Sequence, residues 1–112
     1  QVAFGEAVTF HKGDLLEASW NGSAIGLYVD DAAKTPTLFY HMLVTFAPYW
    51  VPGETVIVLL DYRFSETLKS KRAQRRFRVQ QNIISQNPQC FEEVMQEVFE
   101  PGRMAAFRCA DF

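Results

Sequence analysis

The stretch TVIVLLDY at residues 55–62 is the segment that most restricts how this chain can fold. Its aliphatic residues follow one another without polar interruption, so an extended strand would be apolar on both of its faces. A strand of this kind must be covered on both sides, which predicts a central position in a sheet. At 112 residues the chain fits a single domain, residues 1–112, built around that strand.

Two further strands and a hairpin are expected before this segment. Residues 2–10 fit a strand because Phe4, Val8 and Phe10 are two or four residues apart and would share one face. Residues 15–20 and 24–30 flank Asn21-Gly22, a pair that favours a tight turn because both residues tolerate positive φ. The same asparagine opens the glycosylation sequon Asn-Gly-Ser, and we prefer the turn to the modification.

Residues 37–46 fit two kinds of element. Their aromatic and β-branched content favours a strand, whereas Thr35-Pro36 before them is typical of a helix start. We predict a strand. Pro48, Pro52 and Gly53 then interrupt the chain.

The second half of the chain changes composition and is expected to be mainly helical. A helix is predicted from about Glu66, with Ser65 as its cap, while residues 76–84 fit a helix or a strand. Residues 88–100 are predicted as a helix because Phe91, Val94, Met95 and Val98 form an apolar stripe. Residues 104–109 suit a last strand.

Together these elements predict an α+β fold. We expect an antiparallel sheet or small SH3-like barrel of four to five strands, followed by two helices, with a last strand as an option. The segment 13–20 would suit such a barrel only by analogy at the level of the fold, and that analogy carries no function.

Positive charge is concentrated in one segment, KSKRAQRRFRV at residues 69–79. The window 63–79 holds seven of the eleven Lys and Arg residues, although the whole chain has a net charge of −2. One hypothesis is a solvated helix whose cations spread over most of its circumference. In this hypothesis the cations form ion pairs with acidic residues of the first half of the chain. The alternatives are contact with nucleic-acid phosphates, which Arg forks match in geometry, or an acidic protein partner. The candidate residues are Lys69, Lys71, Arg72, Arg75, Arg76 and Arg78.

Aromatic residues are abundant, with ten Phe in the chain, and two others lie in a proline-bounded loop. Tyr49 and Trp50 are candidate interface residues, because Tyr and Trp bury much area at low entropy cost. The alternative is that Trp50 folds back over the core.

Residues that carry acid–base chemistry are few and scattered. His11 and Asp14, which lie in one expected turn, are a candidate acid–base pair. The adjacent carboxylates Asp30 and Asp31 are a candidate cation site, although they lack the spacing of a calcium loop. No nucleophile motif, zinc motif or phosphate-binding loop occurs, so we expect no catalytic residues, metal or cofactor, and we lean against an enzyme. A small-molecule pocket between sheet and helices would be lined by Phe39, His41, Asp61 and Tyr62.

Cys90 and Cys109 are far apart and lack zinc or redox spacing, so we expect reduced thiols in a cytoplasmic protein, with a single bridge as the alternative. No apolar run is long enough to span a membrane, and no signal peptide is expected.

The favoured hypothesis is a small non-catalytic interaction domain, a homo-oligomer held by aromatic surface and complementary charge blocks. A nucleic-acid-binding protein using residues 69–78 is the first alternative, and a small-molecule site or enzyme is the second.

Overall fold

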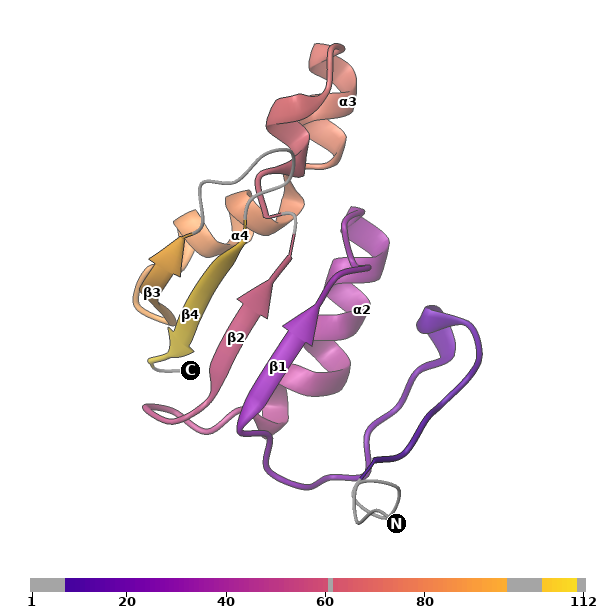
Figure 1. Ribbon diagram of the computed structural model, residues 1–112, viewed down its shortest axis with the longest axis vertical. Coiled ribbons are helices and arrows are strands. Elements are labelled where there is room, and N and C mark those ends of the chain that lie inside the picture. The colour runs from indigo at the N-terminus through magenta and orange to yellow at the C-terminus, as the bar shows by residue number, and fades with distance from the viewer. Residues whose placement is uncertain (1–7, 61, 97–103, 111–112) are drawn as a thin grey trace, which may run out of the picture.

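The computed structural model describes residues 8–60, 62–96 and 104–110, and its centre is an open four-stranded sheet (Figure 1). The strand order is β1-β2-β4-β3. β1 and β2 run parallel, and β4 is antiparallel to both of its neighbours. The α+β class is confirmed, but the sheet is mixed and its edges do not meet, so the described residues form no closed barrel. The strands are β1 (Leu27–Asp30), β2 (Val56–Leu59), β3 (Phe91–Gln96) and β4 (Ala105–Cys109).

The segment that the sequence places at the centre of the sheet is indeed internal. β2 pairs with β1 on one side and with β4 on the other, and Ile57 and Leu59 are almost completely buried. The predicted last strand is confirmed as β4, which lies between β2 and β3.

Residues 37–46, expected as a strand, instead belong to the helix α2 (Pro36–Phe46), with a proline in its first turn. A parallel pair of strands cannot be joined by a tight turn, and α2 supplies the crossover that β1 and β2 require. Phe39 and Met42, three residues apart on the helix, are buried against the sheet. The parallel pairing therefore outweighs the β propensity of these aromatic and branched residues.

The N-terminal hairpin was also predicted wrongly. The short 3₁₀ helix η1 (Leu15–Glu17) replaces the strand expected at 15–20, and β1 pairs with β2 instead. The turn chemistry is nevertheless present, because the Asn21 side chain accepts the Ser23 N–H at 2.9 Å and Gly22 has a φ of 95°. Residues 8–10 are not in a strand, and residues 2–7 of the first expected strand lie outside the described part of the chain.

The basic segment contains two short helices in place of one long helix. A 3₁₀ turn, η3 (Phe64–Thr67), precedes α3 (Lys71–Arg76), which is capped by the Ser70 side chain. The chain turns at Phe77 and Arg78 and continues as α4 (Val79–Gln86), so residues 79–84 are helical. In Figure 1, α3 stands beyond the end of the sheet and forms one tip of the molecule.

The helix predicted at 88–100 is wrong over its described part, because residues 91–96 form the edge strand β3. Phe91 packs against Phe107 with ring centroids 6.2 Å apart, and Glu92 forms an ion pair with Arg108 of β4 at 3.2 Å. A bulge between Glu93 and Met95 shifts the register. The pairing with β4 thus determines the conformation of a segment whose apolar spacing resembles that of a helix. Residues 97–100 lie outside the described part.

The core lies between one face of the sheet and the helices. Its residues are Phe39 and Met42 of α2, Val79 and Ile84 of α4, and Ile57, Leu59, Phe91, Ala105 and Phe107 of the strands. α2 and α4 contact each other, and both lie behind the sheet in Figure 1. The opposite face of the sheet carries no helix within the described residues.

Candidate binding surfaces

The six candidate cations occupy the tip formed by α3 and its flanking turns, which we call the basic tip. Five of them are exposed and Arg78 is half-buried. At about 100° per residue, the four on α3 fall within an arc of about 140°. The basic tip comprises Lys69, Lys71, Arg72, Arg75, Arg76 and Arg78.

The remaining positions of α3 turn toward the body of the protein. Ala73 and Gln74 are half-buried, and the Gln74 amide donates a hydrogen bond to the Leu68 carbonyl at 2.7 Å. The cations therefore form one outward face, and the expectation that they spread over most of the helix circumference is wrong. The physical reason is that Lys71 and Arg75, and likewise Arg72 and Arg76, are four residues apart, which places each pair on the same side of the helix.

None of the cations in the basic tip forms an ion pair with any acid of the described chain. Ion pairs between described residues lie elsewhere and include Lys34 with Asp31, Arg63 with Glu66, and Arg108 with Glu92. The guanidinium of Arg76 lies 5.9 Å from the centre of the Phe77 ring. The hypothesis that acids of the first half neutralise this segment is thus not supported by the described contacts.

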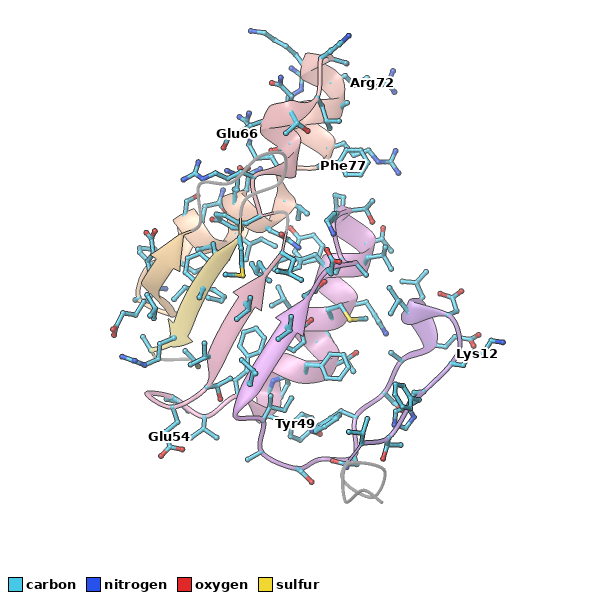
Figure 2. The ribbon with its side chains drawn as sticks, in the orientation of Figure 1. Lys12, Tyr49, Glu54, Glu66, Arg72 and Phe77 are labelled. Atoms are coloured by element: carbon cyan, nitrogen blue, oxygen red, sulfur yellow. The ribbon has the colours of Figure 1, made fainter. Side chains whose placement is uncertain are left out.

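Tyr49 lies at the opposite end of the molecule from Arg72 (Figure 2), and Trp50 follows it in the chain. The Trp50 side chain is buried and packs on Tyr28 and Phe91, with ring centroids 5.3 and 6.2 Å apart. The structure thus shows the alternative in which Trp50 folds back over the core. Tyr49 is half-buried, so the two aromatics and the basic tip do not form a joint surface.

Of the residues proposed to line a small-molecule pocket, Phe39, His41 and Tyr62 line neither of the two cavities formed by described residues. Phe39 is in the core, and Tyr62 is buried against Phe107 at 5.4 Å. Burial raises the pKa of Tyr62 to about 12. His41 is half-buried beside the Ala18 carbonyl, at 3.3 Å from its Nε2 atom. Asp61 lies outside the described residues.

The described residues line two cavities that adjoin the segment before β1 or β1 itself. One, of about 620 Å³, is lined by His11, Asp14 and Trp20 among others, but the Asp14 carboxylate accepts the Leu16 N–H at 2.9 Å. The other, of about 360 Å³, lies beside β1 and is mainly apolar. Neither brings together a nucleophile and a base.

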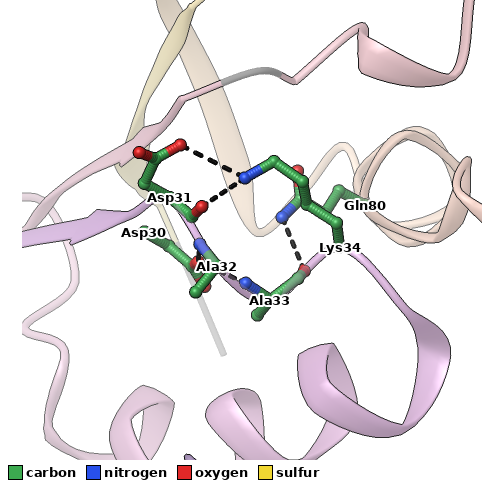
Figure 3. A network of polar contacts seen from close by, with 6 residues as sticks. All are labelled: Asp30, Asp31, Ala32, Ala33, Lys34 and Gln80. Carbon is green, nitrogen blue, oxygen red and sulfur yellow. Dashed lines mark hydrogen bonds and ion pairs between the residues drawn. The ribbon is translucent and has the colours of Figure 1, made fainter.

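The loop after β1 contains a polar network that the sequence did not reveal (Figure 3). Asp30 is buried, and its Oδ1 accepts the N–H groups of Ala32 and Ala33 at 2.9 and 2.8 Å. Its other oxygen accepts the Tyr28 hydroxyl at 3.0 Å. Burial, reinforced by this carboxylate, raises the pKa of Tyr28.

Neighbouring residues complete the network. Lys34 bonds both the carboxylate and the carbonyl of Asp31. Gln80 of α4, itself buried, donates to the Ala33 carbonyl at 2.8 Å. The two carboxylates proposed as a cation site are thus engaged by protein donors. Among the described residues no group of three or more potential metal ligands gathers. The signal that sequence analysis missed is an aspartate at a strand end followed by small residues, which is typical of an Asx turn.

Comparison with protein-family models, curated proteins and solved structures gives no match. Within the part of the chain that the structure describes, no helix combines the length and apolar character needed to cross a membrane.

Proposed function

We propose that this chain is a non-catalytic interaction domain that self-associates through the uncovered face of its sheet. We call this surface the open face. It is composed of Leu27, Val29, Val56, Val58, Ala106, Glu92 and Arg108, which the strand register places on one side. The single observation that supports the proposal is that this face is mainly apolar and bears no helix of the described chain.

The exposure of the open face is unusual for strands of this composition. Leu27 and Val29 are 62% and 53% exposed, and they lie beside the partly exposed Val56 and Val58. Parallel strands are normally covered on both faces, and a contiguous exposed apolar patch commonly marks an interaction site. A second protein layer on this face would complete the arrangement that the sequence of β2 predicts.

The occupant that we propose is a second copy of the chain. The open face carries Glu92 and Arg108 side by side, so it presents both signs of charge near one edge. In a two-fold dimer the same patch meets itself, and a patch with both charges can then pair each with its opposite. The contact would be aliphatic rather than aromatic, because Trp50, Phe39 and Phe107 are committed to the core.

The test is solution mass by light scattering, with a matched pair of substitutions. Val29→Glu places a charge on the open face, whereas Val44→Glu places the same charge on α2, where Val44 is 76% exposed. We expect the wild type and V44E to be dimers and V29E to be a monomer, because the carboxylate would be desolvated in the interface. A wild type that stays monomeric at about 1 mM, or a V29E that stays dimeric, would contradict the proposal.

The cellular setting of this proposal is a reducing compartment such as the cytoplasm. Both cysteines are thiols outside any disulfide, Cys109 buried and Cys90 half-buried. Free thiols of this kind are usual where glutathione keeps proteins reduced.

A further inference from the structure

We propose that the basic tip binds the phosphate backbone of double-stranded DNA, without reading its sequence. The proposal concerns a surface separate from the open face, since α3 stands beyond the end of the sheet in Figure 1. It is therefore independent of self-association.

The charges of the basic tip are unfavourable for the isolated protein. Lys71 and Arg75, and likewise Arg72 and Arg76, are like charges one helical turn apart, and such pairs destabilise a helix. Lys71 and Arg72 also lie in the first turn of α3, where the helix dipole disfavours cations. No acid of the described chain offsets this repulsion with an ion pair. An external polyanion would neutralise the repulsion among these cations, so electrostatics would favour its binding.

The chemistry of the outward face favours phosphate over other anionic partners. α3 turns four cations outward and no apolar side chain, because its one aliphatic residue, Ala73, is half-buried against the body. A protein partner would find no apolar centre to bury there, and a membrane-surface helix needs an apolar face. Four of the six cations are Arg, whose planar fork matches phosphate oxygens at two points.

The surroundings of the basic tip favour a duplex over a single strand. Single-strand binding relies on aromatic side chains on which bases stack. Tyr49 lies at the other end of the molecule (Figure 2), and Trp50 is buried. Phe77 is half-buried beneath Arg76. The Gln74 amide, a candidate for base contact, is bonded to Leu68. An α-helix fits the major groove of B-form DNA, whereas the corresponding groove of double-stranded RNA is too narrow.

The experiment is fluorescence anisotropy of a labelled mixed-sequence DNA duplex, titrated with the full chain at several salt concentrations. If the four cations of α3 each contact a phosphate, log K should fall against log salt with a slope of about −4. Arg72→Glu should weaken binding about tenfold and reduce the slope by about 1. Lys12→Glu changes the net charge equally but is exposed far from the tip (Figure 2), so it should alter neither quantity.

A second charge reversal and three competitors complete the test. Arg75→Glu should reproduce the effect of R72E, and circular dichroism should show both variants folded, because neither side chain has a described contact to lose. Polyglutamate, anionic lipid vesicles and single-stranded DNA should each compete more weakly than unlabelled duplex. No binding at low salt, equal losses for R72E and K12E, or equal competition by any of these three would overturn the proposal. The monomeric V29E variant should keep the slope of the wild type per bound chain, so failure of either proposal is seen separately.

Discussion

Replacing Asp30, the last residue of β1, by alanine should be among the most destabilising single changes of a polar residue in this protein. The substitution removes the acceptor of three hydrogen bonds, to Ala32 N–H, Ala33 N–H and the Tyr28 hydroxyl, at 2.9, 2.8 and 3.0 Å. Alanine would leave the Ala33 N–H buried with no acceptor, since that residue is completely buried.

The magnitude follows from the burial of the three donors. Leaving a buried donor unsatisfied costs about 1–3 kcal/mol, and hydrogen bonds to a charged group lie near the upper end. The Ala32 and Tyr28 donors are only partly buried and can regain water, so we assign about 1 kcal/mol to each. Asp30→Ala should therefore lower the free energy of unfolding by about 3–5 kcal/mol, a large share of the 5–15 kcal/mol typical of a domain.

Urea unfolding followed by circular dichroism measures the effect against two related variants. Asp30→Asn keeps an Oδ1 acceptor for both backbone N–H groups and should cost only about 1–2 kcal/mol. Asp14→Ala removes an aspartate whose one described hydrogen bond, to Leu16 N–H, is exposed, and should cost about 1 kcal/mol or less. If D30A is no worse than D14A, or if D30N is as damaging as D30A, the reasoning from the Oδ1 acceptor fails.

Three further predictions concern other buried groups. Gln80→Ala should cost about 1–3 kcal/mol in urea unfolding because it leaves the Ala33 carbonyl without its donor, whereas Gln86→Ala on the exposed side of α4 should be nearly neutral. The raised pKa of Tyr62 means that the unfolded chain loses its phenolic proton first, so stability should fall as the pH rises from 10 to about 12. Because the pKa of Tyr28 is also raised, Tyr62→Phe should make that decline shallower without abolishing it in pH-dependent unfolding, and an unchanged decline would contradict the assignment. A thiol reagent should modify Cys90 in the folded protein but Cys109 only on unfolding, and equal rates would contradict the burial of Cys109.

The local sequence pattern was sufficient to predict β2, because the apolar residues of this strand require burial. The run at 55–62 is apolar throughout, and any fold of this chain must bury it, which is why β2 was identified correctly. The turn chemistry of Asn21-Gly22 was likewise visible, although the strand partners assigned to it were not. Partner choice depends on which segments meet in three dimensions, and a single sequence does not encode that in its local pattern.

Two of the wrong assignments share one cause. Residues 37–46 have strand-like composition and residues 91–96 have helix-like spacing, yet each adopts the opposite conformation because of its tertiary role. The first must cross over between parallel strands, and the second must pair with β4. Propensities worth a few tenths of a kcal/mol per residue are overridden by such packing.

For the candidate sites, too, the sequence shows local properties and the structure is needed for contacts between distant residues. The basic tip was visible because charge is read directly from the residues, and its lack of ion pairs required the structure. The Asp30 network was missed because its hydrogen bonds come from backbone N–H groups and from Gln80, which is far from Asp30 in the sequence. Trp50 could be interpreted in two ways until its burial was known.

The position of β4 in the middle of the sheet has a consequence for how the chain is made. β1, α2 and β2 are all synthesised well before Ala105–Cys109, which pairs with the second edge of β2. Until that segment leaves the ribosome, β2 presents an unpaired and strongly apolar edge, a template for pairing with other chains. Products cut short before residue 105 should therefore aggregate, so interrupted translation of this chain is expected to place a direct demand on chaperones.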